Sequence, residues 1–271
     1  MFLNKSWIYK SLIMILIIMS CLISQEKLFA QVLSLSVNKE HILSESGIII
    51  DQKTGKPIPD AKVSIPSKGI ETVTDELGIF QLEMPKERPL ILSVKADGYK
   101  PFSLIIEKTT DNNPFKIGLL EKTGNEIVID TRLHHLGDNK FSKRSANASD
   151  FTTTAIGNVY FQDFYIDNLH FQENIVLKIG SIIGIDTRTA QSLRQSEVST
   201  SASSPVEVFF NSHKIGEIDF NGNNHIIKIP STLVQANLNN NIKIKTGINL
   251  SSSSRRKDYD DIEFIHLILE F

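Results

Sequence analysis

Apolar positions between residues 46 and 107 come in short runs separated by turn-forming segments. The separating segments are DQKTGKPIPD, DELG, PKERP and ADGY. Runs of about five residues between Gly, Pro and Asp turns are typical of an all-β sandwich. No part of this region has the 3.6-residue period of an amphipathic helix. The pattern therefore predicts a first domain built from strands, over residues 44–120.

Short apolar runs separated by turns continue after a connecting segment at residues 111–124. The run ENIVLKIGSIIGID predicts a strand, and PVEVFFN followed by HKIGEID predicts a hairpin. The Ser-rich stretch SEVSTSASS is short and lies between strands, so we expect a loop there. The segment STLVQANL predicts one short helical turn. These patterns predict a second all-β domain over residues 125–271.

The first thirty residues differ from everything that follows. Lys5 and Lys10 lie before the apolar run SLIMILIIMSCLI. Further along the chain comes a small residue, Ala30. A positive start, a short apolar run and a small residue form a secretory signal peptide, so we expect residues 1–30 to be one. The run is short for a membrane-spanning helix, which needs about 20 apolar residues. An alternative is a lipid anchor at Cys21.

Composition limits the possible functions. The chain has 271 residues, of which 41% are hydrophobic and 22% charged, and its formal net charge is −2. Such a chain is globular and long enough for two domains. It lacks the basic surplus that nucleic-acid binding requires. Its one cysteine and one tryptophan both lie in the expected signal peptide, so a secreted or periplasmic form would fold without disulfides.

Residues in the first domain carry a resemblance to a known family. They follow the order G-x-[IV]-x-D-x-x-TG-x-P, then TD-x-x-G-x-F, then L-x-V with a later GY. The residues of this sequence that carry the resemblance are Gly47, Asp51, Thr54, Gly55, Pro57, Ala61, Val63, Thr74, Asp75, Gly78, Phe80, Leu82, Leu92, Val94, Gly98 and Tyr99. The segment resembles the carboxypeptidase regulatory-like domain. The resemblance implies a seven-stranded, transthyretin-like sandwich, an accessory module without catalysis.

The second domain resembles the galactose-binding-like jelly rolls of carbohydrate-binding modules. The residues that carry this likeness are His135–Asp138, Ala146, Asn147, Val206–Gly216, Ile227–Pro230, Asn241–Gly247 and Asp260–Phe264. The resemblance implies a jelly-roll sandwich and a polysaccharide partner. Aromatic faces stack on sugars, so we expect Tyr160 and Tyr165 to contact the ligand. The thin supply of aromatic residues leaves open an envelope protein as the partner instead.

The sequence ends with DYDDIEFIHLILEF, from Asp258 to Phe271, in which an acidic run precedes an apolar strand. Residues two apart share a face of a strand, so Asp261 and Glu263 lie about 7 Å apart at the edge of a core. Convergent carboxylates and loop carbonyls suit calcium. We therefore expect a structural calcium ion held by Asp138, Asp261 and Glu263, with Asp260 or Asn147 in support; ion pairing with Arg132, Arg255, Arg256 or Lys257 is the alternative.

Other chemistry has little support in the sequence. Adjacent residues of a strand face opposite sides, so His134 and His135 are poorly placed to share a zinc ion. His266, inside the last apolar run, is expected to be a hydrogen-bonded core residue. There is no G-x-S-x-G motif, P-loop or Rossmann glycine pattern. The sequence thus predicts an exported protein that binds carbohydrate without catalysis, or a structural envelope component that binds protein. An enzyme of polysaccharide or peptide turnover is the third class.

Overall fold

The computed structural model describes residues 44–85, 89–107, 114–141, 151–167, 174–196, 201–251 and 257–271. The expected signal peptide, the alternative lipid site at Cys21, and Asn147, Arg255 and Arg256 lie outside these residues. Nearly all the described chain is β-structure. None of the described helices is both long enough and apolar enough to cross a membrane.

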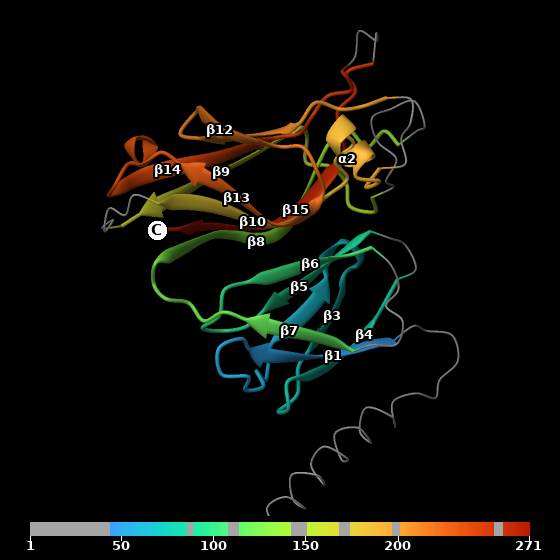
Figure 1. Ribbon diagram of the computed structural model, residues 1–271, viewed down its shortest axis with the longest axis vertical. Coiled ribbons are helices and arrows are strands. Elements are labelled where there is room, and N and C mark those ends of the chain that lie inside the picture. The colour runs from blue at the N-terminus through green and yellow to red at the C-terminus, as the bar shows by residue number, and fades with distance from the viewer. Residues whose placement is uncertain are drawn as a thin grey trace, which may run out of the picture. The chain divides into compact units, whose positions relative to one another are not determined.

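Seven strands form the first sandwich (Figure 1): β1 (Ser44–Asp51), β2 (Lys62–Ile65), β3 (Ile70–Val73), β4 (Ile79–Glu83), β5 (Leu90–Lys95), β6 (Phe102–Ile106) and β7 (Phe115–Leu119). A 3₁₀ turn, η1 (Pro66–Lys68), follows β2. One sheet has the order β4-β1-β7, with β1 and β7 parallel, and the other has the order β3-β2-β5-β6. The predicted seven-stranded sandwich is confirmed.

The turn motif of the first domain has a local structural purpose. The Oδ1 atom of Asp51 accepts hydrogen bonds from the backbone of Lys53 and from both the backbone and the hydroxyl of Thr54. The hydroxyl of Tyr99 donates to Oδ2 of the same carboxylate at 3.1 Å. Gly78 has a φ of +72°, and a Cβ there would lie 2.5 Å from the carbonyl oxygen of Ile49. The motif residues therefore hold the turns of the first sandwich.

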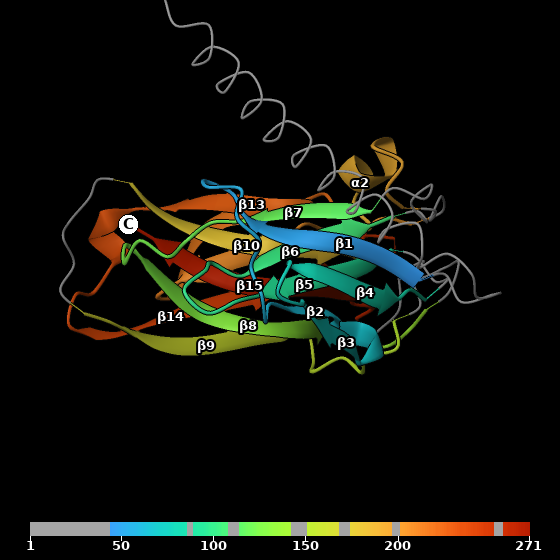
Figure 2. The same ribbon diagram turned by 90° about the horizontal axis from the view of Figure 1, so that it is seen from below.

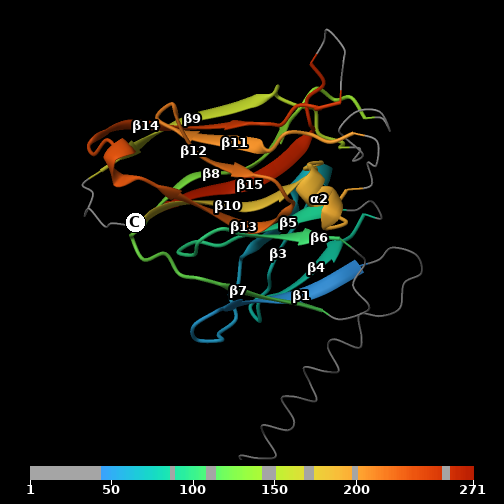
Figure 3. The same ribbon diagram turned by 45° about the horizontal axis from the view of Figure 1, so that its top comes forward.

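Eight strands form the second sandwich: β8 (Glu126–Leu136), β9 (Val159–Ile166), β10 (Ile175–Ile183), β11 (Val206–Phe210), β12 (His213–Ile218), β13 (Gly222–Ile229), β14 (Leu238–Lys245) and β15 (Ile262–Glu270). Two four-stranded sheets, β13-β10-β15-β8 and β12-β11-β14-β9, pack face to face (Figure 3). Each sheet alternates strands from the two halves of the segment, which is the jelly-roll order. The predicted all-β fold with a C-terminal jelly roll is confirmed.

Two short helical elements interrupt the jelly roll. The turn η2 (Ser231–Leu233) lies in the segment where a helical turn was expected. The helix α2 (Arg188–Ser192) was not expected, and the hydroxyl of Thr187 caps its first turn by accepting a hydrogen bond from the backbone of Ala190. The core of the jelly roll lies between the two sheets and is built mainly from isoleucine, leucine, valine and phenylalanine.

The first sandwich lies against the outer face of the sheet β13-β10-β15-β8 (Figures 1 and 2), where β6 contacts β10, β13 and β15. We call this contact region the junction. Ile91, Ile183 and Ile265 form a small buried cluster in it. Polar pairs accompany the cluster, since Ser181 Oγ donates to Ser103 Oγ at 2.8 Å and Ser93 Oγ lies 2.9 Å from His266 Nε2.

The junction explains why the last strand is apolar on both faces. Residues 262–269 are all buried, because one face of β15 packs into the jelly-roll core and the other faces the first sandwich. His266 is 1% exposed and hydrogen-bonded, as the sequence predicts. Gly180 makes room beside it, since a Cβ at that position would lie 2.5 Å from Ser103 Oγ and 2.9 Å from His266 Cβ.

Candidate functional site

The outer face of the other jelly-roll sheet is open and carries aromatic side chains. Along β9, burial alternates strictly, with Val159, Phe161, Asp163 and Tyr165 exposed. Phe161 is 55% exposed and Tyr165 is 52% exposed. Because residues four apart on a strand lie about 13 Å apart on the same face, the two rings form an extended surface and not a single point.

Polar side chains of β14 lie directly opposite these residues. In the antiparallel register, Asn239 faces Tyr165, Asn241 faces Asp163, and Lys243 faces Phe161. Asn239 is exposed and Asn241 is half-buried. We call Phe161, Asp163, Tyr165, Asn239 and Asn241 the aromatic platform. It combines apolar rings with amides and a carboxylate, the mixture that contacts the C–H faces and hydroxyl groups of sugars.

A lysine borders the aromatic platform on its far side. The Lys243 ammonium lies 4.1 Å from the centroid of the Phe209 ring on β11, a cation–π distance. Beyond it, Glu207 accepts hydrogen bonds from Lys214 and Lys245. Glu207, Lys214 and Lys245 thus neutralise one another's charges at the edge of the platform.

Tyr160 was expected to contact a ligand, and the structure corrects this expectation. Its side chain is 4% exposed, and its hydroxyl donates to Asp130 Oδ2 at 3.0 Å. The same carboxylate accepts hydrogen bonds from Arg132 and lies 2.9 Å from His134 Nε2. Burial would raise the pKa of Asp130, but these partners outweigh it and hold the pKa below its usual value. Tyr160 therefore belongs to a buried polar network, and of the two tyrosines only Tyr165 has an exposed side chain.

The acidic residues at the start of β15 are buried and meet hydrogen-bond donors. Asp261 is 0% exposed. Its Oδ1 atom lies 2.9 Å from His135 Nε2 and accepts a hydrogen bond from the backbone N–H of Asn139 at 2.9 Å, while Oδ2 accepts from the backbone of Asp138 at 3.3 Å. Gly137 passes so close to this carboxylate that a Cβ would lie 2.1 Å from Oδ1. Asp261 therefore fastens the loop that follows β8.

His135 completes this arrangement. Its Nδ1 lies against the carbonyl oxygen of Thr153, and its Nε2 faces Asp261. Both partners only accept hydrogen bonds, so both ring nitrogens carry protons. Burial lowers the pKa of His135, but the hydrogen bonds and charge of Asp261 and the carbonyl of Thr153 outweigh it and raise the pKa overall. The pair is a buried imidazolium–carboxylate contact.

The other two expected calcium ligands are also turned toward donors. Glu263 Oε1 accepts a hydrogen bond from Thr153 Oγ1 at 2.9 Å, and burial raises the pKa of Glu263. Asp138 Oδ2 pairs with the Lys140 ammonium at 2.5 Å. Among the described residues, no group of three or more ligating side chains converges on one point. Lone pairs that face N–H and O–H groups do not fit a metal ion, and we assign no calcium to these residues.

Of the expected supporting ligands and ion-pair partners, the structure describes Asp260, Arg132 and Lys257, and Lys257 is exposed. Asp260 is 0% exposed and accepts hydrogen bonds at Oδ2 from Ser203 Oγ at 2.6 Å and from the backbone of Asp186 at 3.1 Å. Burial raises the pKa of Asp260 well above its usual value. Arg132 pairs with Asp130 instead of the terminal acids. A solvated rim, the alternative expectation, does not describe Asp260, Asp261 and Glu263, since all three are buried.

The sequence could have indicated most of the aromatic platform. In VYFQDFYI, positions 159, 161, 163 and 165 share one face, and that face contains Phe161 as well as Tyr165. Choosing between the two faces needs the partner strand, because each face carries two aromatic residues. Asn239 and Asn241 become recognisable only when the register places them opposite β9.

Comparison with known families identifies the first sandwich. Residues 45–129 match the family model of the CarboxypepD_reg-like domain, so the resemblance inferred from the turn motif is confirmed for this segment. No curated protein matches the chain. The galactose-binding-like family of the jelly roll stays a prediction.

Solved structures show distant likenesses. A glycosyl hydrolase family 2 member from Bacteroides cellulosilyticus has a TM-score of 0.30 and 12% identity over 54% of this chain, which spans only 20% of that protein. A proposed carbohydrate-binding protein from Bacteroides uniformis has a TM-score of 0.24 and 12% identity, covering 84% of this chain and 98% of that one. A protein of unknown function from Bacteroides fragilis, proposed to be membrane-associated, has a TM-score of 0.24 and 12% identity. The match covers 84% of this chain and 96% of that one. At these scores none carries an argument about this protein.

Proposed function

We propose that this protein is an exported, non-catalytic carbohydrate-binding protein of the cell envelope or extracellular space, and that the aromatic platform binds the polysaccharide. In this proposal residues 1–30 direct export, residues 44–120 form the accessory sandwich, and residues 125–271 form the recognition domain. The observation that carries it is the pair of half-exposed rings, Phe161 and Tyr165, on the one jelly-roll face that the first sandwich leaves open.

The chemistry of the face supports a sugar. An exposed aromatic ring offers its negative face to the C–H groups of a pyranose. Asn239, Asn241 and Asp163 supply both donors and acceptors at the level of the rings. Sheet backbone holds these side chains in fixed register, so little conformational freedom is lost when a ligand binds. A linear glycan lying along β9 would contact both rings at once.

The test is a binding screen of the full chain against soluble polysaccharides by affinity electrophoresis, followed by calorimetry with the best ligand. Tyr165→Ala and Phe161→Ala should each weaken binding by about tenfold, the size of a lost stacking contact. Phe220→Ala is the matched control, because Phe220 is 41% exposed and does not belong to the platform. Unchanged binding by both platform variants would refute the assignment.

A second candidate is a protein partner in the envelope. The platform face continues into an apolar side chain, since Val159 lies on the same face of β9 and is 38% exposed, and exposed apolar surface is also typical of protein interfaces. This candidate predicts that no polysaccharide is retained in the screen. It also predicts that Val159→Lys, which spares both rings, abolishes association with the partner.

A further inference from the structure

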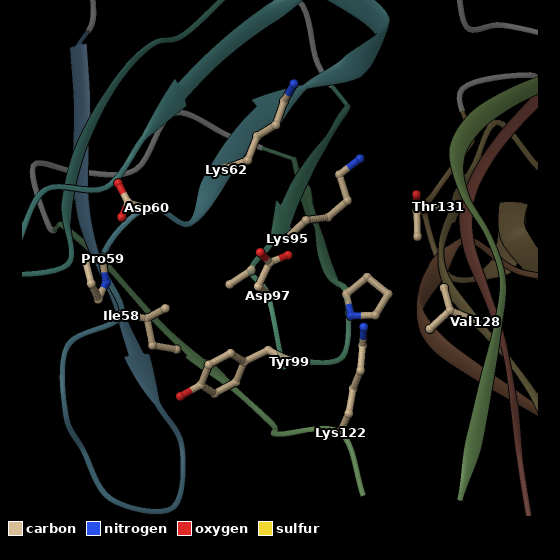
Figure 4. A pocket seen from close by; sticks show the side chains of 12 residues that line it. Ile58, Pro59, Asp60, Lys62, Lys95, Asp97, Tyr99, Lys122, Val128 and Thr131 are labelled. Carbon is tan, nitrogen blue, oxygen red and sulfur yellow. The ribbon is translucent and has the colours of Figure 1, made fainter. Parts of the chain in front are cut away.

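A cavity of about 530 Å³ lies where the first sandwich meets β8 (Figure 4). Most of its lining comes from the sandwich, with Val128 and Thr131 contributed by the jelly roll. Its volume lies within the range of small-molecule sites, about 300–1,000 Å³, and such sites favour domain junctions. It shares no residue with the aromatic platform, so it is a separate candidate.

One wall of the cavity is apolar and fixed. Tyr99 and Ile58 line it, with Pro101 beside them. Ile58 is 5% exposed and part of the sandwich core. The hydrogen bond from the Tyr99 hydroxyl to Asp51 holds the ring in place. A fixed aromatic ring beside aliphatic side chains is a surface on which a sugar ring packs.

The polar lining carries both signs of charge. Lys62, Lys95 and Lys122 line the cavity together with Asp60 and Asp97. The ammonium of Lys62 is paired with Glu71 at 2.5 Å. Within the described chain, Lys95 and Lys122 form no ion pair with a carboxylate. Two cations of the cavity are thus available to a ligand.

Lys95 is the central cation of this region. It also lines a neighbouring cavity of about 350 Å³, together with Ser93, Thr131 and Arg132. The two cavities share Lys62, Lys95 and Thr131, so they lie next to each other at the junction. Lys95 is therefore the unpaired cation that both cavities have in their lining.

We propose that the junction cavity binds a sugar that carries a carboxylate, as uronic acids do. The carboxylate pairs with Lys95, and Lys122, elsewhere in the lining, donates to another oxygen of the sugar; these are the two lysines of the cavity that form no ion pair within the described chain. Asp60 and Asp97 accept hydrogen bonds from the sugar hydroxyls. The C–H face of the sugar packs on Tyr99. Neither a neutral sugar nor a simple anion satisfies both the lysines and the aspartates.

The experiment follows amide chemical shifts of the full chain by NMR in low salt. The probes are glucuronate, glucose and acetate, which separate the sugar from its carboxylate. Glucuronate should give saturable shifts at Tyr99 and Thr131, with glucose and acetate at least about tenfold weaker, the factor expected for a lost charge-assisted hydrogen bond. Lys95→Gln should weaken glucuronate binding by a similar factor, and Lys122→Gln by less.

The controls separate this site from other effects. Lys116→Gln changes an exposed lysine of β7 that does not line the cavity, so glucuronate binding should persist. Tyr165→Ala should leave it unchanged as well, because the aromatic platform is elsewhere. Equal shifts with acetate would reduce the site to nonspecific anion binding, and equal shifts with glucose would remove the role of the lysines. Either result, or an unaffected Lys95→Gln variant, overturns the proposal.

Discussion

The two sheets of the jelly roll have four strands each, and their outer faces have opposite environments. The sheet β13-β10-β15-β8 has the first sandwich on its outer face, and its strand β15 is buried at eight successive positions. The sheet β12-β11-β14-β9 has an open outer face, and its strand β9 alternates between exposed and buried residues. The same fold thus has one outer face covered by the first sandwich and the other exposed.

The interactions on the two sides differ in kind. At the junction, Ser93, Ser103, Ser181 and His266 are buried and hydrogen-bonded. On the open sheet, lysines pair with Glu207 and Glu217 on the surface. Buried polar groups are expensive to disturb, whereas surface ion pairs contribute less than about 1 kcal/mol. Stability should therefore depend on the covered face and binding on the open one.

A new charge should give the largest difference in stability between the covered face and the open face. Ile265→Asp places a carboxylate in the buried cluster with Ile91 and Ile183, and we expect a loss of about 3–5 kcal/mol in the free energy of unfolding. Phe161→Asp, the matched change on the open face, should alter it by no more than about 0.5 kcal/mol. Urea denaturation of both variants measures the difference; equal losses would mean that the two faces are not distinct.

Acid should weaken the covered face through His266. Burial, reinforced by the charge of Lys95, lowers the pKa of His266 to about 4 from 6.5. As pH falls from 6.5 toward 4, His266 becomes protonated in the unfolded chain but stays neutral in the folded one. The free energy of unfolding therefore falls, by at most about 3 kcal/mol, from its value above pH 6.5. His135, whose pKa is raised, contributes in the opposite sense, because its pairing with Asp261 is complete below pH 6.5 and weakens as pH rises.

Unfolding free energies at pH 7, 5.5 and 4.5 measure the effect. The His266→Gln variant isolates it, since every other titrating group is retained. The difference between the original chain and this variant should shrink as the solution becomes more acidic. A pH-independent difference would show that His266 does not resist protonation.

The buried pair of Asp261 and His135, at the loop after β8, should give a smaller difference in stability. Asp261→Asn keeps the shape but removes the charge opposite His135, and should cost about 1–3 kcal/mol. Glu207→Gln removes a carboxylate that pairs with two lysines on the open sheet, and should cost less than about 1 kcal/mol. Thermal melts of the two variants compare them; a larger loss for Glu207→Gln would contradict the ranking.

Calcium should have the smallest effect, namely none. The carboxylates of Asp138, Asp261 and Glu263 are turned toward donors, so the melting temperature should be the same in EDTA and in excess calcium. A site occupied at a hundred times its Kd would add about 2.7 kcal/mol, a shift of several degrees. A shift of that size, lost in Asp261→Asn, would restore the original expectation of a calcium ion.

The sequence predicted the first sandwich well, since its turns are encoded locally. Asp51, Thr54 and Gly78 determine the conformation within a few residues of themselves. The jelly roll was predicted from strand runs and hairpins, but its outer faces were not. Burial of both sides of β15 depends on residues of the first sandwich far earlier in the chain, such as Ile91 and Ser93. The pattern IEFIHLILE indicates this burial only as unusual apolarity.

The site residues were harder to predict for a related reason. A carboxylate in a sequence is equally consistent with a metal ligand and with an acceptor for buried N–H groups. The partners of Asp261 are His135 and the backbone of Asn139, more than 120 residues away. Tyr160 and Tyr165 likewise look equivalent, and only the pairing of β9 with β14 shows that one ring is buried and the other exposed.

The position of β15 also determines the order in which the chain is able to fold. The first sandwich has all seven of its strands once residue 119 has been made. The jelly roll, by contrast, receives a central strand of its covered sheet, between β10 and β8, from its last ten residues. During synthesis, where N-terminal domains generally fold first, the finished sandwich is present before β15 emerges. It then acts as a ready surface against which the final strand closes the sheet.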